Sequence, residues 1–524
     1  MNITSPHSRS AAGLRPAAAA WLCAFAAALL LYGLTMAPGL LWQDSADVQI
    51  AVALDDWRGP YDLARTHVVH LALASAIRHA FDANPAWAAN FVSVLAGALT
   101  VANLVAVLVL ILRRSAAVLA AGTALALSHT LWQFSTAAEV NCMVAAFLSA
   151  ELLILAIFDR VRRGWLLWMV GLVNGLGAAN HNLALLTLTC YVALALLSIR
   201  KWLRPYGRDV LIAAVLWLVG YIPMLVLVIM ELRLGLALRQ VVASALVGSY
   251  ADAVFNVRVT PTDAIKIVGL LGLNFPTPLI FAAVVGWPGL GHRCGHHYRI
   301  VLALLFVTHF LFAARYNVPD QYSFMIPAYW LLGVFLGAGI DVLLERSPAG
   351  RRLALSVLVL ALAVPAPIVY AVLPSLARRL PASVIPVSTR PVPYRDPYKW
   401  FLQPWRPGYD GPERFAREAL AVLPPDAFVL TDTTLRGPIL FLQNHEGLRH
   451  DVRVGEALLQ PFHDRWQPNP DAFRQLVREG RLFSLVGDGK YLCANRWIGD
   501  EFRFRPVGPI YQVVPPRQTD EQGV

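Results

Sequence analysis

Two carboxylates near the start of the chain have a spacing that suits acid–base chemistry. Asp44 and Asp47 follow the first apolar segment and are three residues apart, so on a helix both side chains would face the same way. In a structural interpretation, Asp44 is the N-cap of an interfacial helix and Asp47 is an acid in its first turn. In a catalytic interpretation, one carboxylate is a general base and the other orients or tunes it in a membrane cavity of low dielectric constant.

Histidines later in the same loop could assist these acids. His67 and His70 have the spacing of one helical face. Zinc would need a third ligand at matching reach, and the sequence offers no suitable cysteine or further histidine motif there, so we expect no metal site. We interpret His67 as a hydrogen-bonding residue near the carboxylates, or as a polar residue at the membrane interface. The histidines and the cysteine between 292 and 297 are assigned to a basic loop and not to a metal site.

Four more polar residues lie at the ends of apolar segments, where polar groups are informative because burying them in a membrane is costly. Glu139 begins an apolar segment, and it is either a site residue or a first-turn acid that complements the helix dipole. His181 lies in a turn rich in asparagine and could also donate a hydrogen bond to a phosphate. Arg315 and Asp320 bring a cation and an acid into one loop, either at the site or as a structural ion pair.

The elements that carry these residues are predicted to be membrane helices. The chain has 524 residues, of which 57% are hydrophobic and 15% are charged, and its mean hydropathy is +0.54. Soluble domains carry about 25% charged residues, and a helix of about 20 apolar residues crosses the hydrocarbon core of a bilayer. We predict an all-α polytopic membrane protein with about eleven spans, at about 17–36, 88–112, 115–132, 139–158, 165–180, 182–199, 210–230, 264–287, 300–314, 323–344 and 353–374.

The basic residues predict the orientation of these spans. Short loops rich in arginine and lysine stay in the cytoplasm, and such loops occupy alternate connections, at 113–114, 160–163, 200–208, 293–299 and 346–352. The first apolar segment follows Arg9 and Arg15, and we interpret it as a retained anchor with a cytoplasmic N-terminus, not as a cleaved signal peptide. The polar candidates then lie together on the outer face. The net charge of +11 reflects this orientation and gives no indication of nucleic acid.

The last part of the chain has a different character. Residues 1–375 are predicted to form the membrane domain, 376–410 a Pro-rich linker, and 411–524 a small extracytoplasmic α/β domain. Within it we expect helices at about 412–423, 438–444 and 471–479 and strands at about 427–431 and 482–486. The five cysteines, at 23, 142, 190, 294 and 493, are scattered and indicate no disulfide framework.

The order and spacing of these motifs resemble a membrane family that includes transmembrane protein 260, an O-mannosyltransferase. Asp44-Ser45-Ala46-Asp47 is similar to that family's Asp-Ser-Gly-Glu motif, and His67 to the histidine that opens its His-Pro-Pro-Gly-Tyr-Pro-Leu motif. The other similar segments are Asn90-Phe91-Val92-Ser93, Trp132 with Ala138-Glu139-Val140, Gly175-Leu176-Gly177 with Asn180-His181, and Asp320 with Tyr322 and Pro327. The chain departs from the family at Ala46, Asp47, 68–70 and Asn141. These departures bear on the sugar or the acceptor more than on the reaction class.

The resemblance implies a C-type glycosyltransferase fold and a reaction at the outer membrane face. A sugar, with mannose as the candidate, would pass from a polyprenyl-phosphate donor to a hydroxyl of a protein or glycan acceptor. Asp44 would be the general base and Asp47 would orient it. The donor, its phosphate or the acceptor would be bound by His67, Glu139, His181, Arg315 and Asp320. No cofactor is required in this scheme, although a divalent cation could take part.

Two other functions remain open from the sequence. A secondary transporter would use intramembrane acids as an ion relay, and it typically shows broken helices at the bilayer midplane and an internal repeat. We find no convincing repeat, and the acids cluster at one surface. A non-catalytic relative that binds partners in the cell envelope would account for the altered motifs.

Overall fold

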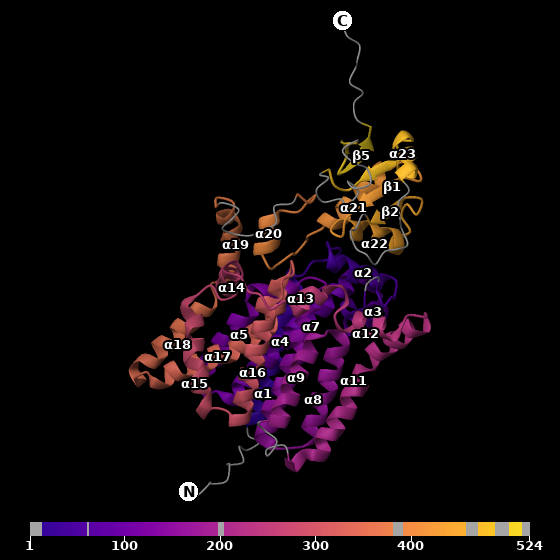
Figure 1. Ribbon diagram of the computed structural model, residues 1–524. Helices are drawn as coiled ribbons and strands as arrows, with labels where there is room; N and C mark the ends of the chain where they lie inside the picture. The colour runs from indigo at the N-terminus through magenta and orange to yellow at the C-terminus, as the bar shows by residue number, and fades with distance from the viewer. Residues whose placement is uncertain are drawn as a thin grey trace.

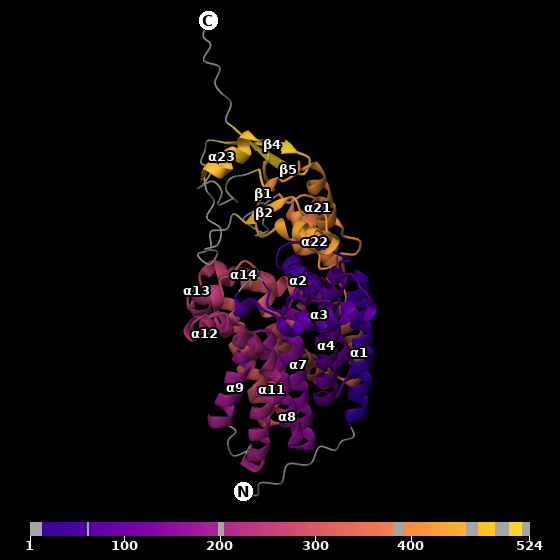
Figure 2. The same ribbon diagram turned by 90° about the vertical axis from the view of Figure 1, so that its right-hand side faces the viewer.

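The computed structural model describes residues 13–59, 62–197, 204–380, 391–456, 470–487 and 502–515. They form a bundle of helices with a small α/β domain at one end, and the first helix of the chain begins at the opposite end of the bundle (Figures 1 and 2). This arrangement confirms the predicted fold class. Arg9, Arg200, Lys201 and Cys493 lie outside the described residues.

The bundle contains the helices that the apolar segments predict. Six helical segments within the described residues are long and apolar enough to cross a membrane. They contain α1 (Leu14–Thr35), α4 (Pro85–Ile111), α7 (Asn141–Val161), η3 with α11 (Arg204–Tyr206 and Gly207–Arg233), α16 (His296–Arg315), and η7 with α17 (Gln321–Met325 and Ile326–Arg346). Two further predicted spans coincide with α8 (Trp165–Asn180) and α9 (Leu183–Leu197), which are shorter. The chain is an integral membrane protein.

Three further predicted spans are bent pairs of helices. If each pair is counted as one span, the described residues hold up to nine spans that are long and apolar enough to cross a membrane, namely the six named above and these three. α5 (Ser115–Ala126) and α6 (His129–Ser135) meet at 59°, and α18 (Ala349–Ala363) and α19 (Ala366–Ala377) meet at 40°. The predicted span 264–287 differs most, because α14 (Pro261–Asn274) turns by 112° into the segment that holds η5 (Pro278–Phe281), α15 (Ala282–Gly289) and η6 (Leu290–His292). Pro276 and Pro278 lie at this break, and proline cannot continue the hydrogen bonding of a preceding helix.

The interior of the bundle is built around α4 and α17. In the most apolar stretches of these two spans, 78% and 89% of the residues are buried. Asn84 caps α4, since its Oδ1 accepts hydrogen bonds from the backbone N–H groups of Ala86 and Trp87, and Pro85 occupies the first helical position. α8 lies against α11 so closely that a Cβ on Gly175 would sit 2.2 Å from the carbonyl oxygen of Trp217. Small residues of this kind let membrane helices approach one another.

The two sets of loops lie at opposite ends of the bundle. At one end, Arg113 and Arg293 both bond Glu345, at 3.2 and 2.7 Å, and Asp159 accepts the backbone N–H of Gly295 at 2.9 Å. At the other end lie the short helices α2 (Asp44–Ala53), η2 (Leu63–Arg65), α3 (Val68–Phe81), α12 (Leu238–Leu246), η4 (Gly248–Tyr250) and α13 (Ala251–Phe255). The basic loops and the polar candidates are therefore separated by the length of the bundle.

The C-terminal domain contains a five-stranded sheet. Its elements are α20 (Pro397–Leu402), α21 (Gly411–Val422), β1 (Phe428–Thr431), α22 (Arg436–Glu446), β2 (Arg453–Glu456), α23 (Pro470–Arg478), β3 (Leu482–Ser484), β4 (Arg503–Val507) and β5 (Ile510–Val514). The strand order is β2-β1-β3-β5-β4, with β1 parallel to β2 and β3 and with β5 antiparallel to β3 and β4. The predicted helices and strands correspond to α21, β1, α22, α23 and β3. Sequence reasoning missed β2, β4 and β5.

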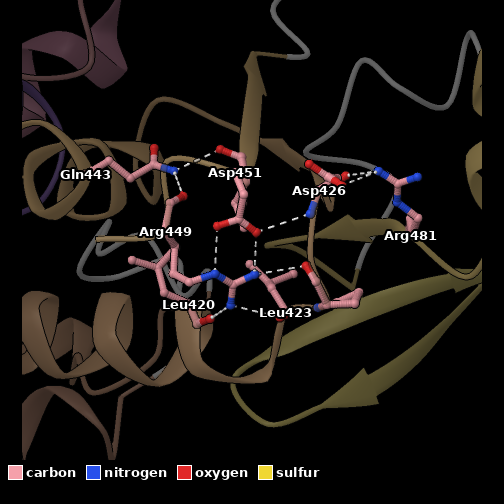
Figure 3. Close-up of polar contacts among 9 residues, drawn as sticks. Leu420, Leu423, Asp426, Gln443, Arg449, Asp451 and Arg481 are labelled. Atoms are coloured by element: carbon pink, nitrogen blue, oxygen red, sulfur yellow. Dashed lines mark hydrogen bonds and ion pairs between the residues drawn. The ribbon is translucent and has the colours of Figure 1, made fainter. Parts of the chain in front are cut away.

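Arg449 forms hydrogen bonds with two of the turns in this domain (Figure 3). Arg449 donates hydrogen bonds to the carbonyl oxygens of Leu420, Leu423 and Pro424 at the end of α21, at 2.7 to 2.9 Å, and its guanidinium also bonds Asp451 at 2.9 Å. The carbonyls at the end of a helix lack partners within the helix. Arg449 therefore satisfies these carbonyls and joins the α21–β1 turn to the turn before β2.

The membrane part and the C-terminal domain share a hydrophobic cluster where they meet. Leu40, Trp42 and Ala86 pack in the same cluster as Phe415 and Ile439 of the domain. The stretch from 391 to 410, part of the segment predicted as a linker, also packs on the bundle. Thr136 Oγ1 donates a hydrogen bond of 2.7 Å to the carbonyl oxygen of Pro404, and His129 Nε2 lies 2.7 Å from the carbonyl oxygen of Phe401. The backbone N–H of Arg406 donates to the carbonyl oxygen of Thr35 at 2.8 Å.

Loss of the Arg449 contacts should loosen the C-terminal domain. We expect Arg449→Met to lower the melting midpoint of this domain by roughly a few degrees. Amide exchange on the full chain in detergent, followed over a series of temperatures, measures this midpoint, and Arg474→Met is the control.

The hydrogen bond from Arg449 lowers the pKa of Asp451 to about 2. This stabilisation is therefore complete above about pH 4 and is lost as the pH falls through the folded pKa. A difference in stability between the wild type and Asp451→Asn that stays constant from about pH 4 to about pH 2 would contradict the contact between Arg449 and Asp451.

Candidate active site

A cavity of about 460 Å³ lies at the end of the bundle that carries the short helices. All seven candidate residues line it: Asp44, Asp47, His67, Glu139, His181, Arg315 and Asp320. They come from α2, from the loops before α3 and α7, from the turn between α8 and α9, and from the end of α16 with the loop that follows it. The fold thus brings together residues that are up to 276 positions apart in the sequence.

The two aspartates of α2 have different surroundings. The side chain of Asp44 is 69% exposed and lies 3.6 Å from the guanidinium of Arg65. The side chain of Asp47 is 10% exposed, and its Oδ1 accepts a hydrogen bond of 3.0 Å from Arg436 of α22. The N-cap of α2 is Gln43, so the interpretation of Asp44 as the N-cap is wrong. Both acids lie in the first turn, where they complement the helix dipole, and Asp44 is the carboxylate that is accessible from the cavity.

Glu139 is buried next to α2. Its Oε1 accepts a hydrogen bond of 2.9 Å from Ser45 Oγ, and its backbone N–H donates to Ser93 Oγ at 3.0 Å. Burial, with the nearby charge of Asp44, raises the pKa of Glu139 to about 8. Helix α7 begins two residues later, at Asn141, so Glu139 is not the first-turn acid that the sequence suggested. At neutral pH its carboxyl is mostly protonated and can donate a hydrogen bond.

The two histidine rings stack on one another, with centroids 5.4 Å apart and planes at 15°. Nδ1 of His67 lies 2.9 Å from the carbonyl of Asn180, and Nδ1 of His181 accepts the backbone N–H of Leu183 at 3.1 Å. Burial lowers the pKa of His67 to about 4 and that of His181 to about 3. Both rings are therefore neutral at pH 7. A neutral ring whose Nδ1 accepts carries its proton on Nε2, so His181 Nε2 is a hydrogen-bond donor.

Arg315 and Asp320 line the same cavity but do not form the ion pair that was one interpretation of the loop. Nη1 of Arg315 donates to the carbonyl oxygens of Val254, at 2.6 Å, and Asn256, and the guanidinium lies 5.0 Å from the centre of the Phe312 ring. Asp320 accepts a hydrogen bond of 3.4 Å from Ser323 Oγ. Burial, with the charge of Asp44, raises the pKa of Asp320 to about 6.

Sequence reasoning missed two cations of the cavity. Arg58 and Arg65 line it together with Arg315. Arg65 faces Asp44 and also lies 5.8 Å from the centre of the Tyr250 ring, while Arg58 pairs with Glu231. Both are in the loop 37–87, which the charge pattern assigns to the outer side. Arginine and lysine are usually concentrated in the cytoplasmic loops of membrane proteins. Two arginines in an outer loop are an exception, and this exception was the signal in the sequence that could have identified them.

The lining of the cavity combines charged and apolar side chains. Its acids and arginines line it together with Leu185, Leu186, Phe312 and Phe324. Such a lining suits a ligand with an anionic head and an apolar chain. No group of three or more His, Cys, Asp or Glu side chains among the described residues is arranged to hold a metal ion.

Comparison with solved structures identifies the fold. The chain is similar to ArnT from Cupriavidus metallidurans bound to undecaprenyl phosphate, with a TM-score of 0.57 and 15% identity over 95% of this chain and 99% of that one. The apo structure of the same protein gives a TM-score of 0.59 and 15% identity, over 96% of this chain and 100% of that one. The chain therefore has the fold of ArnT, which agrees with the predicted all-α membrane fold with a small C-terminal domain. No family model and no curated protein sequence matches the chain, so the resemblance to the transmembrane protein 260 family stays a prediction.

The protonation of Glu139 can be tested through the stability of the protein. Because the folded pKa of about 8 lies above the unfolded value, the folded state keeps a proton that the unfolded chain releases. The difference in free energy of unfolding between the wild type and Glu139→Gln should then fall between about pH 4.5 and 8, by up to about 1.4 kcal/mol per pH unit, and level off above that. The variant is needed for comparison because His67 and His181, whose pKa values burial lowers, change the stability in the opposite direction below about pH 6.5. Thermal melts in detergent across the range would show it, and parallel curves for the two proteins would argue against a buried neutral carboxyl.

Proposed function

We propose that the protein is a membrane glycosyltransferase that moves a sugar from a polyprenyl-phosphate donor to a hydroxyl group of an acceptor. One observation carries this proposal: Asp44 is exposed in a cavity that is lined by three arginines and by apolar side chains. The fold supports it, because the chain has the architecture of ArnT, which is seen bound to undecaprenyl phosphate. In this chain the phosphate would lie at the arginines and the isoprenoid chain against the apolar side chains of the lining.

The reaction is a direct displacement at the anomeric carbon. Asp44 takes the proton of the acceptor hydroxyl, the acceptor oxygen forms a bond to the anomeric carbon, and the bond to the phosphate oxygen breaks. The polyprenyl phosphate leaves with the electron pair of that bond. General-base catalysis of this kind contributes roughly 10² to 10⁴-fold. Arg65, 3.6 Å from Asp44, would stabilise the charge on the leaving phosphate.

The neutral groups of the cavity would orient the substrates. His181 Nε2 and the protonated carboxyl of Glu139 would donate hydrogen bonds without attracting counter-charge, and the unbonded nitrogen of His67 would accept one. Asp320 would face the acceptor or the sugar. The scheme needs no cofactor, and a divalent cation at the phosphate is compatible with it.

Mannose and a protein or glycan acceptor are the finer part of the proposal, and they rest on the motif resemblance alone. Mass spectrometry of envelope proteins and glycans from cells with and without the gene identifies the acceptor and the added mass together. A mass difference of one hexose on a serine or threonine would support protein O-mannosylation.

Removing the proposed base should abolish transfer. We expect Asp44→Asn to lower the rate of sugar transfer from polyprenyl-phosphate donors in membranes by roughly 10² to 10⁴-fold, with normal expression. Arg65→Met should raise the donor KM, and Arg315→Ala should also weaken donor use. Asp82→Asn is a matched control, because Asp82 is an exposed aspartate at the end of α3. Full activity of Asp44→Asn would remove Asp44 from the mechanism.

The orientation predicted from the loop charges is part of the same proposal, because the cavity must face the side on which the acceptor lies. In a cysteine-free background, Asp471→Cys reports on the C-terminal domain, where the native side chain is 85% exposed. Gly350→Cys reports on the basic segment 346–352, because Gly350 lies in the first turn of α18 with open space around it. We expect a membrane-impermeant maleimide to label the cysteine at 471 in intact cells and the cysteine at 350 only after permeabilisation. The reverse pattern would place the cavity in the cytoplasm.

A further inference from the structure

A buried ion pair joins the C-terminal domain to the candidate site. Arg436 is the first residue of α22, and its Nη2 donates to Asp47 Oδ1 across 389 positions of sequence. The two side chains are 9% and 10% exposed. A buried carboxylate that loses its partner is strongly destabilising. The pair therefore makes the first turn of α2 depend on a residue of the other domain.

The turn before α22 holds Arg436 in this position. β1 ends at Thr431, and the next residue, Asp432, accepts hydrogen bonds through Oδ1 from the backbone N–H groups of Thr434 and Leu435, at 3.2 and 3.1 Å. The backbone N–H of Arg436 donates to the carbonyl of Asp432 at 3.2 Å. Open α/β sheets usually bind ligands beyond the carboxyl ends of their parallel strands. Here the helix α2 of the membrane part is bound beside the turn at that end of β1.

The two helices are also in close van der Waals contact. A Cβ added to Gly437 would lie 2.4 Å from the Cβ of Ala46, so no larger side chain fits at 437 unless the helices move apart. Just before α2, Trp42 donates a hydrogen bond of 2.7 Å to the Tyr409 hydroxyl and packs on Phe415. The domain thus fixes both the entry to α2 and its first turn.

The membrane part holds the other side of α2. Ser45 Oγ donates to Glu139 at 2.9 Å, and Gln49 Nε2 donates to Asn90 Oδ1 at 3.0 Å. Asp44 itself projects toward the cavity, with Arg65 at 3.6 Å. The position of the Asp44 carboxylate is thus set by contacts from both parts of the molecule.

We propose that Arg436 is a positioning residue of the active site, which acts through Asp47 to hold the first turn of α2, so that transfer requires the docked C-terminal domain. This inference rests on the proposed function. Arg436 contacts no substrate in this scheme. Its guanidinium neutralises Asp47 and fixes the direction in which the neighbouring carboxylate of Asp44 meets the acceptor hydroxyl.

A double-mutant cycle on the full chain tests this route. We expect Arg436→Met to lower kcat by roughly 10 to 100-fold, as a small displacement of a catalytic group does. The donor KM should stay close to that of the wild type, because the three cavity arginines are untouched. Asp47→Asn should have a comparable effect, and the double variant should lose no more than the worse single variant, since the two residues act as one unit. Arg436→Lys keeps the positive charge but lacks the planar guanidinium group, so this variant should be more active than Arg436→Met and less active than the wild type.

A measurement that does not depend on activity accompanies the cycle. Amide exchange of α2 should be faster in Arg436→Met than in the wild type, and Arg474→Met, which removes an exposed arginine on α23, should change neither exchange nor kcat. Unchanged exchange of α2, unchanged kcat, or losses that multiply in the double variant would each overturn the proposal. If the wild type transfers no sugar from any polyprenyl-phosphate donor, the proposed function fails. The exchange of α2 then still decides whether Arg436 positions this helix.

Discussion

The ten-residue helix α2 is the element on which the rest of the site depends. It lies where the membrane bundle meets the C-terminal domain, and different side chains of it face different partners. Ser45 and Gln49 bond groups of the bundle, Asp47 bonds Arg436 of the domain, and Asp44 projects into the cavity. A short helix has little stability of its own. Its position is therefore set by these tertiary contacts, and the same contacts set the position of the exposed carboxylate.

Burial divides the polar groups of the cavity into charged and neutral ones. Asp44 is accessible and has a guanidinium beside it, whereas desolvation raises the pKa of Glu139 and lowers those of His67 and His181. At neutral pH Glu139, His67 and His181 are mostly uncharged and act as hydrogen-bond donors and acceptors. This division suits a lipid-linked phosphate, since its charge can meet the arginines while the remaining polar groups orient substrates without bringing further charge into a region of low dielectric constant.

Much of the bundle followed from local properties of the sequence. Runs of apolar residues predicted its helices, because a membrane requires them to be long and to satisfy their own backbone groups. The prediction was least accurate for the segment 264–287, where prolines break the helix, and it missed β2, β4 and β5. β4 is largely exposed, and an exposed strand lacks the apolar alternation by which strands are recognised. The separation of basic loops from polar candidates also followed from sequence, since both depend on which end of a helix a residue occupies.

By itself, the sequence determined that the chain is a polytopic membrane protein with its polar candidates at one end, because hydropathy and loop charge act locally along the chain. Only the tertiary structure decided that Asp44 and not Asp47 is accessible, that Arg58 and Arg65 join the cavity, and that Arg315 bonds backbone carbonyls instead of Asp320. The contact between Arg436 and Asp47 could not be read from spacing, because 389 positions separate them. Pairs of this kind form only after two independently patterned parts have packed together, and the sequence carries no local periodicity that records such packing.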